Sequence, residues 1–361
     1  MNRLVGRLGL ARYSGLYVFA FFVLVHSLWL PNTFPTGTTL QSVASNQAIT
    51  GVAALGLVCA LSAGAFDLSI ANVVGLSSTV AAALTVQAGL SPASAIAIVL
   101  GMGLAVGLVN GLLIVRFRIP SVVATLGMSS ILMAFDDRIT EGQFITPLPP
   151  SFTELTKGSL LGIPIPFLAL IVVALLTWYL LEHTPLGRRM IATGAGADAA
   201  RLAGTNTGRM TVAGLVISGV LGSLAGLMLV STIGTAAPNS GPAYLLPLFA
   251  AVYLGSTQIK PGRFNIWGTI VALYVLATGV KGLQLAGGQY WVAELFNGAA
   301  LIIAVGVAIS AQERRRSLLG RLRPRRRAEP TAGPGDPDPG ESRGPDATRR
   351  EARDEYAGPR S

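Results

Sequence analysis

The sequence is poor in charge and in cysteine. Of its 361 residues, only 12% are Asp, Glu, Lys or Arg, whereas 51% are hydrophobic, and the mean hydropathy is +0.59. A soluble protein with a single core would need far less apolar surface than this, so a membrane is the natural solvent. The single cysteine, Cys59, can form no intrachain disulfide, and we interpret it as a small core residue.

Groups that carry out chemistry are equally scarce. The sequence has two histidines, His26 and His183, no cluster of Cys and His, and no pair of carboxylates within an apolar run. It also lacks the GxxxxGK[ST] phosphate loop, and its GMGLAVG stretch has the wrong spacing for a dinucleotide site. We therefore expect no enzyme activity, no ATPase motif, no catalytic residues, no metal site and no cofactor.

What the sequence has in quantity is apolar runs of about 20 residues, long enough to cross about 30 Å of hydrocarbon as helices. They predict an all-α polytopic membrane protein with about ten transmembrane helices, some of them short or broken. The expected spans cover residues 13–30, 47–64, 69–88, 93–115, 121–135, 167–181, 210–233, 244–254, 266–283 and 291–311.

Composition divides the chain into three regions. Residues 1–12 form an N-terminal segment, residues 13–311 the transmembrane domain, and residues 312–361 a tail rich in Arg, Pro and Gly. The tail has too few large apolar residues to offset the entropy cost of folding, so we expect it to be disordered. Within the domain, the prolines of residues 136–166 rule out a continuous helix and predict an ordered external loop. Residues 184–209 form a second polar connection.

The net charge of +10 is explained either by nucleic-acid binding or by membrane orientation. If the N-terminus is cytoplasmic and every span crosses, eleven Lys and Arg residues fall in inside connections and three in outside ones. We therefore expect both chain ends in the cytoplasm and no nucleic-acid partner. The inside residues are Arg3, Arg7, Arg12, Arg116, Arg118, Arg188, Arg189, Arg201, Arg209, Lys260 and Arg263, and the outside residues are Arg138, Lys157 and Lys281.

Polar residues interrupt several apolar runs. Asp67 lies between two spans, with Gly64 before it and Ser69 after it, which fits a broken helix that Asp67 or Ser69 caps where it restarts at Ile70. The same pattern fits a carboxylate that faces an aqueous path, because unwound backbone is tolerated beside a cavity. Uncharged residues such as Asn72 favour either interhelical hydrogen bonds or solute contacts. The candidate residues of a translocation path are Gln47, Asp67, Ser69 and Asn110.

Glycines at intervals of four predict close packing between helices. Gly103, Gly107 and Gly111 share one helix face, and Gly222 and Gly226 share another. Small residues on such a face let neighbouring backbones approach closely in a membrane.

Residues 192–209, ATGAGADAARLAGTNTGR, form a polar interlude of small residues between two apolar runs. Asp198 suits a helix N-terminus, Arg201 its last turn and Gly204 the position just beyond its end. The apolar face of so short a helix cannot stabilise it alone, so it needs a surface. That surface is the protein's own spans, the lipid interface or a separate cytoplasmic protein. The residues of the expected contact are Asp198, Ala199, Arg201, Leu202, Ala203 and Gly204.

Five stretches carry a family resemblance, and they occur in the family's order over residues 45–309. They are GAFDLSIANVVGLSSTVAA, NGLLIVRFRIPSVVATLGMSSI, LPPSFTELTKGSLLGIPIPF, GRRMIATGAGADAARLAGTNTGR and YWVAELFNGAALIIAVGVAI. The chain resembles the membrane permease subunits of ribose-type sugar ABC importers, within the larger group that includes branched-chain amino acid permeases.

The resemblance implies a multi-pass protein of the bacterial cytoplasmic membrane that forms the path for a sugar or a related small polar solute. It implies a homodimer or pseudo-dimer, two cytoplasmic ATPase subunits that supply the energy, and an extracytoplasmic solute-binding protein. By this analogy the helix at residues 197–204 is the coupling helix to the ATPase. The chain departs from the family after GTAAPNSGPAY, where it reads LLPLFAAVYLGSTQIKPGRF. The resemblance therefore does not identify ribose as the solute of this chain.

Two other classes of function stay open on the sequence. One is a secondary transporter driven by an ion gradient, in which Asp67 is the coupling carboxylate. The other is an enzyme or scaffold embedded in the membrane.

Overall fold

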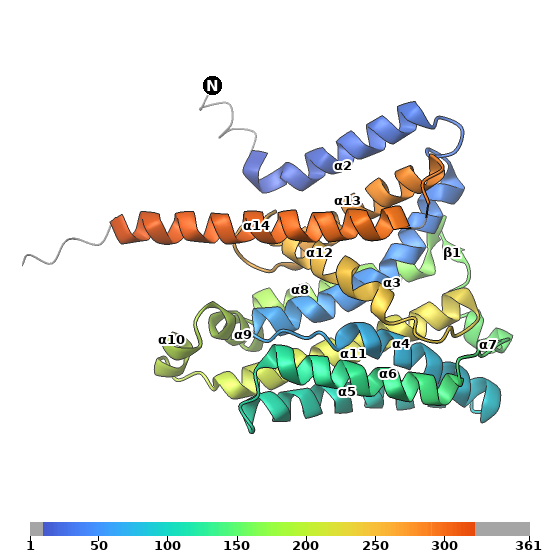
Figure 1. Cartoon of the computed structure of the whole chain (residues 1–361), viewed down its shortest axis with the longest axis horizontal. Coiled ribbons are helices and arrows are strands. Elements are labelled where there is room, and N and C mark those ends of the chain that lie inside the picture. The colour runs from blue at the N-terminus through green and yellow to red at the C-terminus, as the bar shows by residue number, and fades with distance from the viewer. Residues whose placement is uncertain (1–9, 290, 322–361) are drawn as a thin grey trace, which may run out of the picture. The chain divides into compact units, whose positions relative to one another are not determined.

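The computed structural model describes residues 10–289 and 291–321, which are almost entirely helical (Figure 1). The predicted helical fold class is confirmed, with one small addition, an antiparallel hairpin that pairs Ser159 with Pro164 and Leu160 with Ile163. The N-terminal segment before Leu10 and the tail after Arg321 lie outside the described residues. The elements are α2 Leu10–Trp29, α3 Gly37–Ser62, α4 Ile70–Ala82, the π-helical turn η1 Ala83–Gln87, α5 Pro92–Val115, α6 Ser121–Thr140, α7 Pro150–Thr153, β1 Ser159–Leu160, β2 Ile163–Pro164, α8 Ile165–His183, α9 Pro185–Ala195, α10 Ala197–Leu202, α11 Thr207–Ile233, the 3₁₀ turn η2 Pro242–Tyr244, α12 Leu245–Gly255, α13 Ile266–Leu285 and α14 Trp291–Arg321.

Six helices of the described chain are long and apolar enough to cross a membrane. They are α3, α4 with η1, α5, α8, α11 and α13. Three shorter apolar helices accompany them, Tyr13–Trp29, Pro242–Gly255 and Trp291–Gly306. The expected count of about ten is therefore not confirmed by length and composition.

Helix α11 is the centre of the packing, with α5 on one side and α4 on another. A side chain at Gly107 of α5 would bring a Cβ within 2.5 Å of the Leu215 carbonyl oxygen, and one at Gly103 would meet the Gly219 carbonyl. On the α4 side, Gly226 lies equally close to the backbone of Val74. Both predicted glycine faces are thus confirmed as helix contacts in which backbones touch.

The largest apolar cluster surrounds the second half of α3, where every residue from Ala48 to Ser62 is buried. Leu170 of α8, Met210 of α11 and Leu248 of α12 pack against it. Cys59 lies inside this cluster with no exposed surface, as predicted for a core residue.

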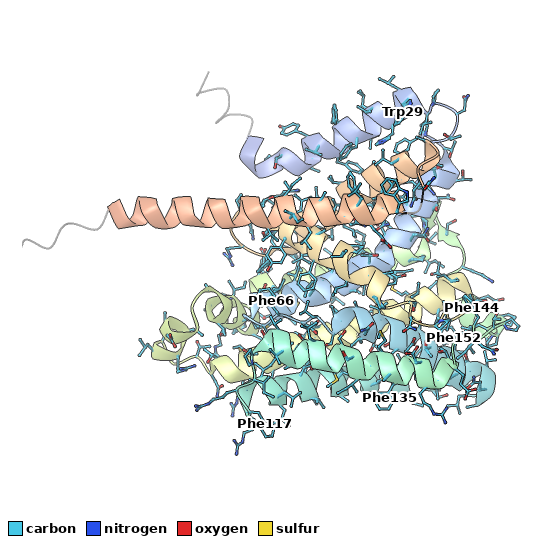
Figure 2. All side chains as sticks on the ribbon, viewed as in Figure 1. Trp29, Phe66, Phe117, Phe135, Phe144 and Phe152 are labelled. Atoms are coloured by element: carbon cyan, nitrogen blue, oxygen red, sulfur yellow. The ribbon has the colours of Figure 1, made fainter. Side chains whose placement is uncertain are left out.

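The helical bundle has two ends of different character. At one end lie α9, α10 and the α5–α6 connection, and we call it the basic end because Arg116, Arg118, Arg188 and Arg189 lie there (Figure 1). At the opposite end lie α7 and the hairpin, and we call it the hairpin end. Figure 2 labels Phe66 and Phe117 toward the basic end and Phe144 and Phe152 at the hairpin end. Four of the basic residues that were expected inside therefore lie at the same end of the bundle.

Several boundaries differ from the expected ones. Helix α6 continues through Thr140, so the first residues of the expected external loop, 136–166, are helical. The remainder of that loop holds only α7 and the hairpin, as its prolines predict. Within the expected connection at residues 184–209, α9 is a helix that sequence reasoning missed. Helix α14 continues through residues 312–321, which were expected to begin the disordered tail.

Candidate functional site

The break between α3 and α4 is organised around Asp67, which is buried. The backbone N–H and the hydroxyl of Ser69 both donate to Asp67 Oδ1, at 3.1 and 2.6 Å. The Ser218 hydroxyl of α11 donates to Oδ2 at 2.6 Å. Both carboxylate oxygens therefore have partners, which offsets the cost of burying them.

Asp67 or Ser69 was predicted to cap α4; Ser69 is the residue at its N-cap, and Asp67 accepts from the backbone N–H of Ser69. The Ser69 side chain makes no capping hydrogen bond of its own, because its hydroxyl points to Asp67. Asn110 of α5 donates from Nδ2 to Ser69 Oγ at 2.9 Å. Three of the four residues predicted for a translocation path thus form one buried cluster that joins α4, α5 and α11.

Helix α6 is tied to the same break. The Phe66 N–H donates to Ser121 Oγ at 3.2 Å, and the Leu68 N–H donates to Thr125 Oγ1 at 3.1 Å. One turn further on, Asn72 donates to the Ser129 backbone and hydroxyl. Asn72 and Asn110 therefore both make the interhelical hydrogen bonds that were one of their two predicted roles.

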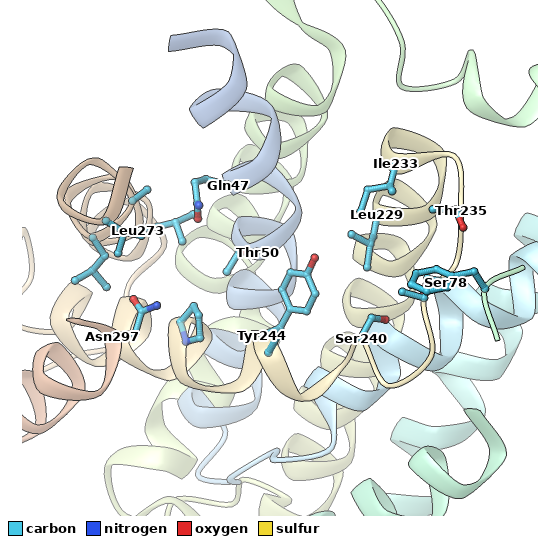
Figure 3. Close-up of a pocket in the computed structure, with 17 residues that line it drawn as sticks. Gln47, Thr50, Ser78, Leu229, Ile233, Thr235, Ser240, Tyr244, Leu273 and Asn297 are labelled. Atoms are coloured by element: carbon cyan, nitrogen blue, oxygen red, sulfur yellow. The ribbon is translucent and has the colours of Figure 1, made fainter. Parts of the chain in front are cut away.

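A separate cavity of about 470 Å³ opens among α3, α4, α11, α13 and the segment that joins α11 to α12 (Figure 3). It falls in the range of about 300–1,000 Å³ typical of small-molecule sites. Gln47, the fourth predicted path residue, lines it, whereas Asp67, Ser69 and Asn110 do not. Its polar lining residues are Gln47, Thr50, Ser78, Thr235, Ser240, Tyr244 and Asn297.

The chemistry of this cavity is uncharged. Its described lining holds hydroxyl and amide groups among Leu, Ile, Ala, Val, Pro and Phe side chains, and no Asp, Glu, Lys or Arg. The Ser240 hydroxyl oxygen is buried and has no hydrogen-bond partner among the described residues. Such a lining suits a neutral molecule that both donates and accepts hydrogen bonds.

Sequence reasoning missed most of the residues that line the cavity. Ser240 and Tyr244 belong to the stretch GTAAPNSGPAY, whose Gly and Pro content marks a non-helical connection. Asn297 lies in an apolar helix and had the same kind of signal as Gln47, a lone amide in a span. Nothing in the local pattern separates these residues from amides that pair with other helices.

At the basic end, α10 presents a bare apolar side chain. Leu202 is 91% exposed, and Ala199 and Ala203 are exposed with it, while Ala200 is the residue that α10 buries. Gly204 has φ +80°, which confirms the predicted position just beyond the helix end. The predicted apolar face of α10 therefore points away from the described part of the chain.

Helix α10 also carries two charged side chains. Arg201 and Asp198 approach within 3.7 Å, and both side chains are largely exposed. Beneath α10, helix α9 buries Met190 and brings Gly194 against the backbone of Ser62 at the end of α3. Helix α9 thus mounts α10 on the core while leaving its outer side free.

A family profile described as the permease component of the branched-chain amino acid transport system matches residues 39–305. The chain belongs to this permease family. No solved structure matches the chain significantly.

Curated relatives agree with the family. The ribose import permease protein RbsC of Bacillus subtilis is 31% identical over 82% of this chain and 91% of its own length. The Escherichia coli K12 protein of the same name is 30% identical over 76% of this chain and 86% of its own length. The autoinducer 2 import system permease protein LsrD of Photorhabdus laumondii is 30% identical over 71% of this chain and 78% of its own.

These findings confirm the resemblance seen in the sequence. The chain is a multi-pass membrane protein of the ABC-importer permease type, as its family, its relatives and its apolar helices together show. The family is a transport component, which agrees with the expectation that the chain is not an enzyme.

Proposed function

We propose that this permease forms the translocation path for a sugar or a related small uncharged solute, with energy from a separate ATPase subunit. The observation that carries the proposal is the cavity of about 470 Å³ lined by hydroxyls, amides and apolar groups. A monosaccharide has hydroxyls for the polar groups and C–H faces for the apolar ones, and it needs no countercharge.

The ATPase docks on α10. Because Leu202 is 91% exposed, the protein's own described spans are not the surface that covers it. A leucine with two exposed alanines beside it suits a shallow groove in a cytoplasmic partner, and burial of the leucine contributes about 1.5–3 kcal/mol. Asp198, Arg201, Ala203 and Gly204 complete the contact, which makes α10 the coupling helix.

The membrane arrangement completes the proposal. Helix α6 is 20 residues long, and with the three shorter apolar helices it extends the six candidate spans to ten crossings. Both chain ends are then in the cytoplasm of a bacterial cell, and α10 lies on the cytoplasmic side. A second permease copy and an extracytoplasmic solute-binding protein are the remaining partners, and the binding protein delivers the solute at the hairpin end.

Ion coupling through Asp67 has less support. Both oxygens of Asp67 accept hydrogen bonds from serines, and the residue does not line the cavity. A coupling carboxylate has to exchange an ion with the solute path, so this placement favours a structural role.

Transport in proteoliposomes tests the proposal. The permease is reconstituted with its ATPase and its solute-binding protein, and uptake of radiolabelled D-ribose and D-glucitol is followed with ATP inside or outside. We expect uptake that requires ATP on the ATPase side and survives a proton or sodium ionophore. Uptake by the permease alone that collapses with an ionophore at constant ATP would instead establish the ion-coupled carrier.

A further inference from the structure

The segment between α11 and α12 runs along the cavity and carries a serine whose hydroxyl has no hydrogen-bond partner among the described residues. Ser240 lies on this segment, between Thr235 and Tyr244, and all three line the cavity (Figure 3). The Ser240 oxygen is buried without a partner among the described residues, although Ser78 nearby donates to the Gly75 carbonyl. A buried hydroxyl left unpaired costs about 1–3 kcal/mol. Of the three buried side-chain atoms without a partner among the described residues, Ser240 Oγ is the one whose residue lines the cavity, the others being Asn110 Oδ1 and Gln258 Oε1.

Two carboxylates of α6 hold the residue next to Ser240. Asp136 is buried and accepts from the Asn239 backbone N–H at 2.8 Å and from the Thr79 hydroxyl at 2.5 Å. Asp137 accepts from Asn239 Nδ2, also at 2.8 Å. Asn239 has φ +54°, a left-handed conformation that asparagine tolerates better than most residues. Its amide and its backbone are thus fixed from one helix.

A close backbone contact fixes the other side of the same turn. Gly241 packs against α4 so tightly that a Cβ there would lie 2.8 Å from the Ala71 carbonyl oxygen. A Cβ at Gly75 would lie 2.7 Å from the Gly241 nitrogen. Earlier in the segment, Ala236 and Ile145 exchange two backbone hydrogen bonds. Ser240 is therefore presented by a turn that is restrained before and after it.

We propose that Ser240 is a solute-binding residue for uncharged, hydroxyl-bearing solutes, and that Asp136 and Asp137 are positioning residues that hold its turn against the cavity. The proposal rests on the proposed function, since it takes the cavity as part of the transport path. A serine hydroxyl donates one hydrogen bond and accepts others, which matches a sugar or polyol hydroxyl. The acidic side chains act only through Asn239, because neither lines the cavity.

A single-cysteine reporter measures occupancy of the cavity without altering Ser240. Cys59 is buried, and Cys59→Ala removes it, so Ala243→Cys provides one thiol at an exposed position in the cavity lining. The full importer is assembled, and the rate of thiol modification by a hydrophilic methanethiosulfonate is recorded with increasing D-ribose, D-glucitol or D-gluconate. Glucitol and gluconate form a matched pair, because they share a polyol chain and differ in charge.

We expect the neutral probes to slow modification and gluconate to leave it unchanged. In the Ser240→Ala variant, the concentration for half protection rises about three- to tenfold, the change expected for one lost hydrogen bond. Asn239→Gly keeps the left-handed turn and removes only the amide held by Asp137, and we expect it to raise the same concentration by a smaller factor. Asp136→Asn removes one acceptor oxygen and should raise the concentration for half protection at least as much as Ser240→Ala does.

A purely structural role for the turn predicts something else. Asp136→Asn would then lower the unfolding temperature and leave the half-protection concentration of the folded fraction unchanged. That result, or a Ser240→Ala variant with unaltered protection, would overturn the proposal, as would failure of both neutral probes to protect. ATPase stimulation by the same permease separates the proposed importer function from the proposed Ser240 site. We expect stimulation to depend on α10 and not on Ser240, so a failure of the Ser240 site alone would leave it intact.

Discussion

The two ends of the helical bundle treat polar groups in opposite ways. Near the basic end, Asp67, Ser69, Asn110 and Ser218 are linked by hydrogen bonds inside the helix contacts, although Asn110 Oδ1 is buried without a partner among the described residues. Toward the hairpin end, hydroxyls and amides of the same kinds line an open cavity, and the Ser240 hydroxyl has no described partner. A polar residue in an apolar span therefore has a structural or a solute-facing role depending on whether another helix already satisfies it.

Each end also exposes a leucine, and the two leucines differ in the structure that carries them. At the basic end, Leu202 of α10 is almost fully exposed at a position mounted on the core by α9. At the hairpin end, Leu161 of the hairpin turn is 94% exposed but belongs to a two-residue connection between two short strands. The two exposed leucines therefore differ in their support, because Leu202 lies on a helix that packs on α9 and Leu161 lies in a short turn.

The largest effect is expected at Asp67. Asp67→Ala leaves the Ser69 and Ser218 donors buried without an acceptor, so the free energy of unfolding should fall by about 3 kcal/mol or more. Asp67→Asn keeps one acceptor oxygen, and we expect a smaller loss of stability and only a modest loss of ATP-driven uptake. Thermal unfolding of the purified permease, beside uptake in proteoliposomes, measures both. Full stability with abolished uptake would move Asp67 into the solute path.

The next effect is expected at α10. Leu202→Asp should weaken association with the ATPase about ten- to hundredfold, because it removes the burial of one leucine from the contact. Stability of the isolated permease should not change, since Leu202 contacts little of its own chain. Ala199→Arg should act in the same direction by overfilling the groove.

Leu161→Asp is the matched control for this prediction, because it makes the same change at an equally exposed leucine of the opposite end. Co-purification with the ATPase measures association in all three variants. Retention of the full ATPase complex by Leu202→Asp and Ala199→Arg would show that α10 serves the lipid interface instead.

Asn110 and Gln47 test the difference between a paired amide and one that lines the cavity. Asn110→Ala should lower the free energy of unfolding by about 1 kcal/mol and leave the affinity for solute unchanged, because its amide bonds another helix. Gln47→Ala should do the opposite, raising the solute concentration for half protection about three- to tenfold with unaltered stability. If the two variants changed the free energy of unfolding and the concentration for half protection equally, the structural role of Asn110 and the solute-facing role of Gln47 would not be distinct.

The smallest effect is expected for the ion pair of α10. Arg201 and Asp198 are 3.7 Å apart and both exposed, and pairs of this kind contribute about 0.5 kcal/mol or less. Arg201→Lys keeps the charge and should leave ATPase association nearly unchanged. A loss as large as that of Leu202→Asp would mean that Arg201 forms a bidentate contact with a carboxylate of the partner.

Much of the helical architecture could be predicted from residue pattern alone. Glycines spaced by four identified the faces where α11 meets α5 and α4, because a missing side chain permits close approach whatever the partner is. The bounds of α10 also followed from Asp198 and Gly204. Helix α9 was missed because its residues, PLGRRMIATGA, have a low apolar content and resemble a loop.

Pattern could not assign the polar residues, and two pairs show why. Gln47 and Asn110 were grouped together as path residues, since each is a lone amide in an apolar run, yet the first lines the cavity and the second bonds α4's N-terminal cap. Ser218 was not singled out at all, although it donates to Asp67 across 151 residues of sequence. Serine is common in such spans, and nothing local marks the one that faces a carboxylate.

The sequence by itself determined that this protein is helical, lies in a membrane and belongs to a family of permeases, because hydropathy, glycine spacing and motif order are properties of short stretches. It also determined where α10 begins and ends. Only the tertiary structure decided which polar groups are paired and which are left to a solute, because a hydrogen bond between helices depends on residues far apart in the chain. Asp136, Asn239 and Ser240 become one functional unit only when the fold brings α6 and the segment after α11 together. A local sequence pattern cannot show this contact, because Asp136 and Asn239 are 103 residues apart in the chain.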